Sequence, residues 1–147
     1  MVNTVRVAGL LVVLCWGATA SAHHSVAVNF DSSQMLTLTG RITELDIRNP
    51  HSQITLKVTQ PDGKAKEWLI EWSDRNALIR RKVPFHLLRV GDTVTVNASP
   101  SRRLDGLAYF RNAVLPDKTV VRDCGFEAFR QAIAKGQFPE CEPERPR

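Results

Sequence analysis

The sequence predicts an all-β fold: a small five-stranded OB-like barrel with one short helix between strands three and four. Three runs of alternating apolar and polar residues are followed by a short stretch with helical spacing, and then by two more alternating runs. Gly40 interrupts the first run, and a glycine inside a strand indicates a bulge or a sharp bend. A bent first strand and this order of elements match the OB barrel. A generic small β-sandwich or an SH3-like barrel is the alternative.

The expected elements follow from the side-chain pattern along the chain. Residues 23–35 are polar and mixed, and they lead into the fold. Strands are predicted at 36–45, 53–59, 65–72, 93–98 and 107–115, with a short edge strand at 120–121. The helix is predicted over 75–82, because Ser73 or Asp74 can cap its start and Pro84 ends it.

The length and charge of the chain restrict the classes of protein it can belong to. The 147 residues suit one small domain and are too few for two. This length excludes most large cofactor folds, and the sequence contains no glycine-rich phosphate loop. The net charge of +5 suits a soluble protein and is weakly indicative of an anionic partner.

The N-terminal segment has the features of a cleaved export signal. Arg6 supplies positive charge, and residues 7–16 form an apolar run too short for a stable membrane anchor. Small residues allow cleavage after Ala22 or after Ala20. We expect a periplasmic or secreted protein without a membrane anchor after cleavage. The predicted organisation is a signal peptide (1–22), a barrel domain (23–121) and a C-terminal extension (122–147).

The cysteines predict a structural disulfide. Cys15 would leave with the signal, so Cys124 and Cys141 would remain as a pair in an oxidising compartment. Closing the loop between them would stabilise the fold by roughly 3 kcal/mol in the chain-entropy model. The wide spacing lacks the close pairing typical of redox-active cysteines. Since residues 125–135 have helical spacing, the extension is expected to be helical, disulfide-linked and frayed at its tail.

Short motifs occur in a fixed order along the chain. They are Ala22-His23-His24-Ser25, Phe30-Asp31, Leu38-Thr39-Gly40, Asn49-Pro50-His51, Asn76-Ala77-Leu78-x-Arg80-Arg81 and Gly91-Asp92-x-Val94-x-Val96. Together, over about residues 20–116, they resemble domain-of-unknown-function family 6152, which consists of small exported bacterial proteins. The resemblance implies an all-β exported domain and supplies no catalytic residues. The segment from Cys124 to Cys141 departs from the family's usual pattern, in which the chain stops near the last hairpin.

Three histidines, His23, His24 and His51, are candidate ligands for Cu(II). Cleavage at either site would place His23 at or near the new N-terminus, where amine and imidazole nitrogens form a planar set suited to this ion. Pro50 restricts its neighbours and would hold His51 at the barrel rim. The alternatives are an unliganded histidine tail and a His51 that orders its loop by bonding to nearby backbone. His86 lies in an apolar stretch and is expected to be structural.

Aromatic and arginine side chains form a second candidate site, a ligand-binding face of the barrel. Its members are Trp68, Trp72, Tyr109 and Phe110 with Arg102, Arg103 and Arg111. OB folds use stacking and charge of this kind to bind strands and sugars, although tryptophans on one strand face are more often core residues. Arg80-Arg81-Lys82 is interpreted as a solvated helix face, with a carboxylate or phosphate partner as the alternative. The partner surface that we predict comprises Trp72, Arg80, Arg81 and Arg103.

These observations favour an exported, monomeric, non-enzymatic binding or accessory module. Its partner would be an unknown exported protein or a small ligand, and export argues against nucleic acid. A periplasmic copper-binding protein is the first alternative, and small-ligand or anion binding on the aromatic and arginine face is the second. Catalysis has little support, because Glu67 and Glu71 lie too far apart along a strand to act as a pair.

Overall fold

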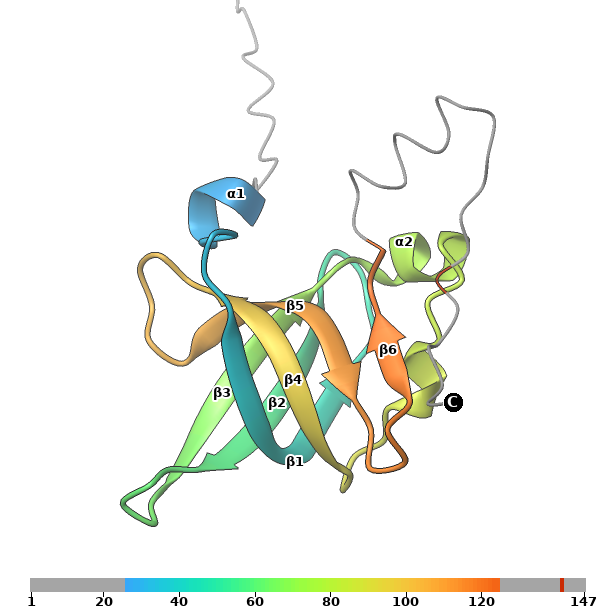
Figure 1. The fold of residues 1–147 in the computed structure, drawn as a ribbon. Coiled ribbons are helices and arrows are strands. Elements are labelled where there is room, and N and C mark those ends of the chain that lie inside the picture. The colour runs from blue at the N-terminus through green and yellow to red at the C-terminus, as the bar shows by residue number, and fades with distance from the viewer. Residues whose placement is uncertain (1–25, 125–140, 142–147) are drawn as a thin grey trace, which may run out of the picture.

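The computed structural model describes residues 26–124 and 141 and contains a closed five-stranded barrel (Figure 1). Its strands are β1 Leu36–Asp46, β2 Ser52–Thr59, β3 Ala65–Trp72, β4 Thr93–Pro100 and β5 Leu107–Val114. They pair antiparallel in the order β3-β2-β1-β4-β5. Parallel pairing of β3 with β5 closes the barrel. The long first strand pairs with both β2 and β4, as the OB topology requires, so the predicted fold class is confirmed.

Shorter elements cover the ends and one edge of the barrel. They are α1 Val26–Asn29, α2 Arg75–Arg80, the 3-10 helix η1 Phe85–Leu87 and the edge strand β6 Val120–Arg122. Asp74 is the cap of α2, since its carboxylate accepts a hydrogen bond from the backbone N–H of Ala77 (2.8 Å). The helix ends two residues earlier than predicted, because Lys82 has a positive φ of 52°. No helix among the described residues is long and apolar enough to cross a membrane.

The irregularity in β1 does not lie at the glycine that suggested it. The bulge falls between Ile42 and Glu44, where the register against β2 shifts. Gly40 instead allows two strands to approach closely. A Cβ atom built on Gly40 would lie 2.5 Å from the backbone oxygen of Lys57 on β2, well inside van der Waals contact. The glycine is therefore required by the close approach of β2 rather than by the bulge.

Replacing Gly40 with alanine is expected to destabilise the barrel by about 1–3 kcal/mol, because the added methyl group collides with backbone atoms that cannot rotate away. Chemical denaturation measures this change in the free energy of unfolding. Thr39→Ala, an exposed neighbour on the same strand, is the matched control and should cost less than about 1 kcal/mol. Equal stabilities of the two variants would contradict the close approach of β1 and β2.

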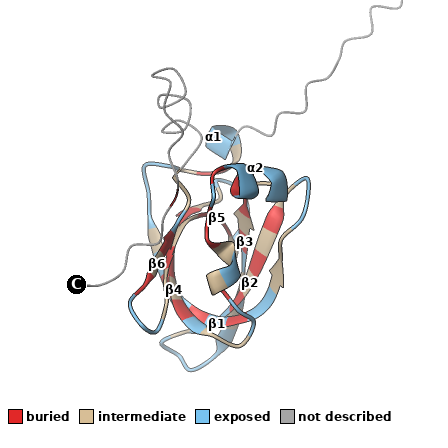
Figure 2. Cartoon of the chain, turned by 90° about the vertical axis from the view of Figure 1, so that its right-hand side faces the viewer, coloured by how far each residue is buried: buried red, intermediate tan, exposed pale blue. Residues whose placement is uncertain are grey.

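The core fills the barrel with side chains from alternating strand positions, and Figure 2 shows this alternation of burial along the strands. Trp72, the last residue of β3, is fully buried, with its ring centroid 4.0 Å from that of Phe110. The prediction that Trp72 belongs to a partner surface is therefore wrong. Ile70, two positions earlier on β3, is also fully buried, so strand alternation directs Trp72 to the barrel interior.

The predicted disulfide between Cys124 and Cys141 is present, with Cα atoms 5.7 Å apart. Cys141 is buried, and its backbone N–H donates a hydrogen bond to the carbonyl oxygen of Arg81 (3.0 Å). Cys141 thus attaches the C-terminal part of the chain to the end of α2. The helix expected over 125–135 and the frayed tail lie outside the described residues.

Candidate functional site

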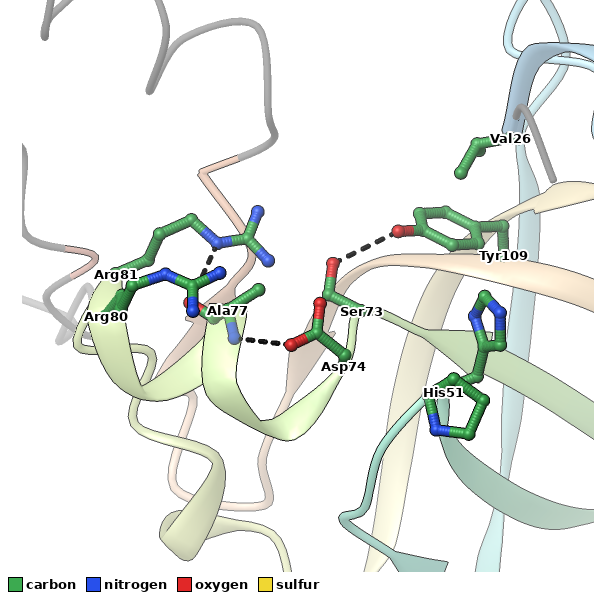
Figure 3. A pocket seen from close by; sticks show the side chains of 9 residues that line it. Val26, His51, Ser73, Asp74, Ala77, Arg80, Arg81 and Tyr109 are labelled. Atoms are coloured by element: carbon green, nitrogen blue, oxygen red, sulfur yellow. Dashed lines mark hydrogen bonds between the residues drawn. The ribbon is translucent and has the colours of Figure 1, made fainter. Parts of the chain in front are cut away.

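A cleft opens between α1 and α2 at one end of the barrel, with a volume of about 210 Å³ (Figure 3). We call it the α1–α2 cleft. It is lined by Val26, Pro50, His51, Ser73, Asp74, Ala77, Arg80, Arg81 and Tyr109. Arg80 and Arg81 approach from α2, whereas Tyr109 and His51 lie opposite them and Ser73 and Asp74 lie between. A second cavity of about 260 Å³ shares Val26, Ser73, Arg81 and Tyr109 with the cleft.

The loop between β4 and β5 holds α1 in place beside the cleft. The backbone N–H of Arg102 donates to the carbonyl oxygen of Asn29 (2.8 Å), and its guanidinium lies 3.3 Å from the carboxylate of Asp31. Phe30 is buried, and it forms an isolated β-bridge with Ser101. These contacts fix the position of Val26, the first residue of α1, on the wall of the cleft.

A chain of hydrogen bonds runs from the cleft into the core. The hydroxyl oxygens of Tyr109 and Ser73 lie 3.1 Å apart. Ser73 also donates to Asp123 Oδ2 (3.1 Å), and the indole N–H of Trp72 donates to the same oxygen (2.9 Å). Asp123 Oδ1 lies 2.7 Å from the Arg81 guanidinium. Asp123 therefore joins β3, α2 and the segment before the disulfide.

Arg81 does not belong to a solvated helix face, so that prediction is wrong. Only 6% of its side chain is exposed, and Asp123 is equally buried at 5%. The Arg81 Nε also donates to the backbone oxygen of Ala77 (3.2 Å). A guanidinium can be buried when a carboxylate compensates its charge, and this partner lies far along the sequence on another element. Arg80, its neighbour, is exposed and lies beside the cleft, as Figure 3 shows.

Burial raises the pKa of the Tyr109 hydroxyl above its ordinary value of 10.0. The hydrogen-bond contact with Ser73 acts in the opposite direction, and the negative charge of Asp123 acts in the same direction as burial. Tyr109 is therefore a neutral phenol at physiological pH. Its hydroxyl proton remains available for a hydrogen bond.

The raised pKa of Tyr109 is directly measurable, because the chain contains one tyrosine. We expect its near-UV tyrosinate absorbance to titrate with a midpoint above 10.0 in the folded protein. The same titration in denaturant should give about 10. Because the pKa of Tyr109 is higher in the folded than in the unfolded state, the neutral hydroxyl stabilises the folded protein below pH 10. This stabilisation is lost as the pH rises through the folded midpoint. Identical midpoints in the two states would contradict the buried position of the hydroxyl.

The histidines predicted as copper ligands are only partly described. His51 lines the cleft, with Nδ1 lying 3.1 Å from Glu71 Oε1. His23 and His24 lie outside the described residues. Within residues 26–124 and 141, no group of three His, Cys, Asp or Glu side chains is placed to hold a metal ion. His86 is exposed on η1, so its predicted packing role is wrong.

The predicted aromatic and arginine face does not form one surface. Trp72 and Phe110 are core residues, whereas Tyr109 lines the α1–α2 cleft. Trp68 and Arg103 line a separate, shallow cavity under the loop between β4 and β5. The ammonium of Lys66 lies 4.5 Å from the centroid of the Trp68 ring. Arg102 and Arg111 are engaged by Asp31 and Ser99 respectively.

Two residues of the predicted partner surface, Arg80 and Arg81, therefore line the cleft. His51, one of the predicted copper ligands, lines it as well. Arg103 lies elsewhere. The sequence interpretation missed Val26, Asp123 and the contact of Ser73 with Tyr109. Ser73 was noticed only as a helix cap, and no local pattern marks Asp123 as the partner of Arg81.

Comparison with known proteins identifies a family. A model of a family of unknown function, DUF6152, matches residues 10–108. No curated protein matches the chain. Similar solved structures include two crystal forms of Rim1, the mitochondrial single-stranded DNA binding protein of S. cerevisiae. Form 1 is 15% identical with a TM-score of 0.45, over 56% of this chain and 92% of that one. Form 2 is 18% identical with a TM-score of 0.43, over 56% and 93%.

Proposed function

This chain belongs to DUF6152, a family of unknown function, and from the geometry of its cleft we propose that it is an exported, non-enzymatic module that binds a small ligand. The ligand has an apolar body and one anionic group, and it occupies the α1–α2 cleft. The observation that carries this proposal is the convergence of arginine, histidine and tyrosine side chains on a cavity with apolar walls.

The shape and lining of the cleft support a compact ligand. Its volume of about 210 Å³ lies below the ~300–1,000 Å³ typical of pockets for drug-sized ligands, which favours a compact ligand. Val26, Pro50 and Ala77 supply apolar surface for a ring or a short chain. Such walls favour a ligand that is mostly apolar, with few polar groups to fix its orientation.

Charge at the rim supports an anionic group on the ligand. Arg80 is exposed beside the cleft and has no acidic partner among the described residues. Its guanidinium is therefore available to a carboxylate, with which it can form paired hydrogen bonds. The charge of Arg81 is already neutralised by Asp123. Arg81 therefore offers a ligand hydrogen-bond donors in a fixed position rather than an uncompensated charge.

Filling the cleft tests the proposal. Calorimetric titration of the protein with benzoate and its hydroxy and methoxy derivatives should detect saturable binding by at least one of these probes. Ala77→Trp places a large ring in the cleft and should weaken that binding more than tenfold. Ile79→Trp is the matched control on the same helix, because Ile79 is 46% exposed and does not line the cleft. Binding that withstands Ala77→Trp, or is absent for all probes, would overturn the proposal.

A copper(II) site at a processed N-terminus is a second proposal. It rests on the sequence alone, in which His23 and His24 would lie at or near the processed N-terminus. Cu(II) titration of signal-cleaved protein, with the N-terminus identified by intact mass, tests it. One-to-one binding should weaken strongly on His51→Ala and on addition of an extra N-terminal residue. Weak binding that is indifferent to both changes would contradict it.

A further inference from the structure

The hydrogen bonds behind the α1–α2 cleft have a fixed direction. Asp123 is a carboxylate paired with Arg81, and a carboxylate only accepts hydrogen bonds. Ser73 donates its single hydroxyl proton to Asp123. The contact between Ser73 and Tyr109 (3.1 Å) therefore has Tyr109 as the donor.

This direction determines what Tyr109 offers to a ligand. Its hydroxyl proton points to Ser73, so the oxygen presents only lone pairs to the cleft that it lines. Asp74, which also lines the cleft, adds a second acceptor. A ligand group facing Tyr109 must consequently be a hydrogen-bond donor. An ether or a second carboxylate at that place would leave the Tyr109 oxygen without a donor and would meet its lone pairs.

From these contacts we infer that the α1–α2 cleft selects a hydroxy acid: a small, largely apolar carboxylate whose hydroxyl group donates to Tyr109 while its carboxylate faces Arg80. The inference rests on the proposed function and adds the class of ligand.

Matched pairs of probes separate a donor from an acceptor of similar shape. We would measure the affinities of the three hydroxybenzoate isomers and of the corresponding methoxybenzoates by calorimetry. At least one isomer should bind the unaltered protein about tenfold more tightly than its methoxy counterpart, the effect of one unsatisfied buried hydrogen bond. Equal affinities, or a preference for the methoxy compound, would overturn the inference and leave the proposed cleft intact. Absence of binding by every probe would overturn both.

Two variants test whether the preference for hydroxyl over methoxy probes depends on the hydrogen bond between Tyr109 and Ser73. Tyr109→Phe removes this acceptor and should clearly reduce the preference for hydroxyl over methoxy. Ser73→Ala releases the Tyr109 proton, which becomes available to a ligand oxygen, so the methoxy probe should gain affinity. A general loss of structure would weaken both probes equally, and thermal unfolding of each variant checks its fold. Persistence of the full preference in both variants would contradict the inferred direction.

Discussion

Asp123→Ala should lower the free energy of unfolding by about 3–5 kcal/mol, because it leaves the buried guanidinium of Arg81 without a compensating charge. Trp72 and Ser73 would lose their acceptor at the same time. Equilibrium denaturation followed by tryptophan fluorescence measures the loss. Few single substitutions in this chain are expected to be more damaging, since Asp123 joins three separate parts of the fold.

A double-mutant cycle separates the ion pair from the other contacts. Arg81→Met removes the charge and retains much of the buried side-chain volume. The double variant Arg81→Met with Asp123→Ala should be more stable than Asp123→Ala alone by more than about 1 kcal/mol, because no unpaired charge remains in the interior. If the stability losses of Arg81→Met and Asp123→Ala simply add in the double variant, the ion pair between Arg81 and Asp123 is not the reason why Asp123→Ala is destabilising.

Trp72→Ala is the second variant with a large expected effect, about 3–5 kcal/mol, because it leaves a cavity in the buried core. The substitution also removes the stacking on Phe110 and the hydrogen bond to Asp123. Denaturant unfolding of the purified variant reports the change.

Trp68→Ala is the control for Trp72, because it removes the same side chain from the same face of β3 at a partly exposed position. Its cost should be clearly smaller, since a partly exposed ring buries less apolar area. A core role for Trp72 predicts this difference. Similar costs at the two positions, or a mild effect at Trp72, would contradict the core role of Trp72.

The fold was predictable because strand alternation is a local property of the sequence. β3 was predicted with its observed bounds, and the cap of α2 at Asp74 was one of two candidates. α1 was not predicted, because four residues of mixed polarity carry no periodic signal. Its position depends on contacts with Arg102, which is distant in the sequence.

The site was predictable only in part, because it depends on barrel closure. Parallel pairing of β3 with β5 places Tyr109 opposite Glu71, and so beside Ser73, although these residues lie far apart in the sequence. No local pattern carries this pairing. Arg81 was misassigned for the same reason: a basic run on a short helix is usually solvated, and the distant carboxylate that buries this arginine has no sequence signature of its own.

The central claim, that the α1–α2 cleft is the binding site, has a direct test in the single tyrosine of the chain. The protein is labelled on its tyrosine ring and on its tryptophan indole nitrogens, and NMR follows a titration with the tightest hydroxybenzoate. The ring resonances of Tyr109 should shift saturably, while the indole resonance of Trp68, which lines the separate cavity, should stay in place. A saturable shift at Trp68 with Tyr109 unmoved, or no shift at either residue, would contradict the account.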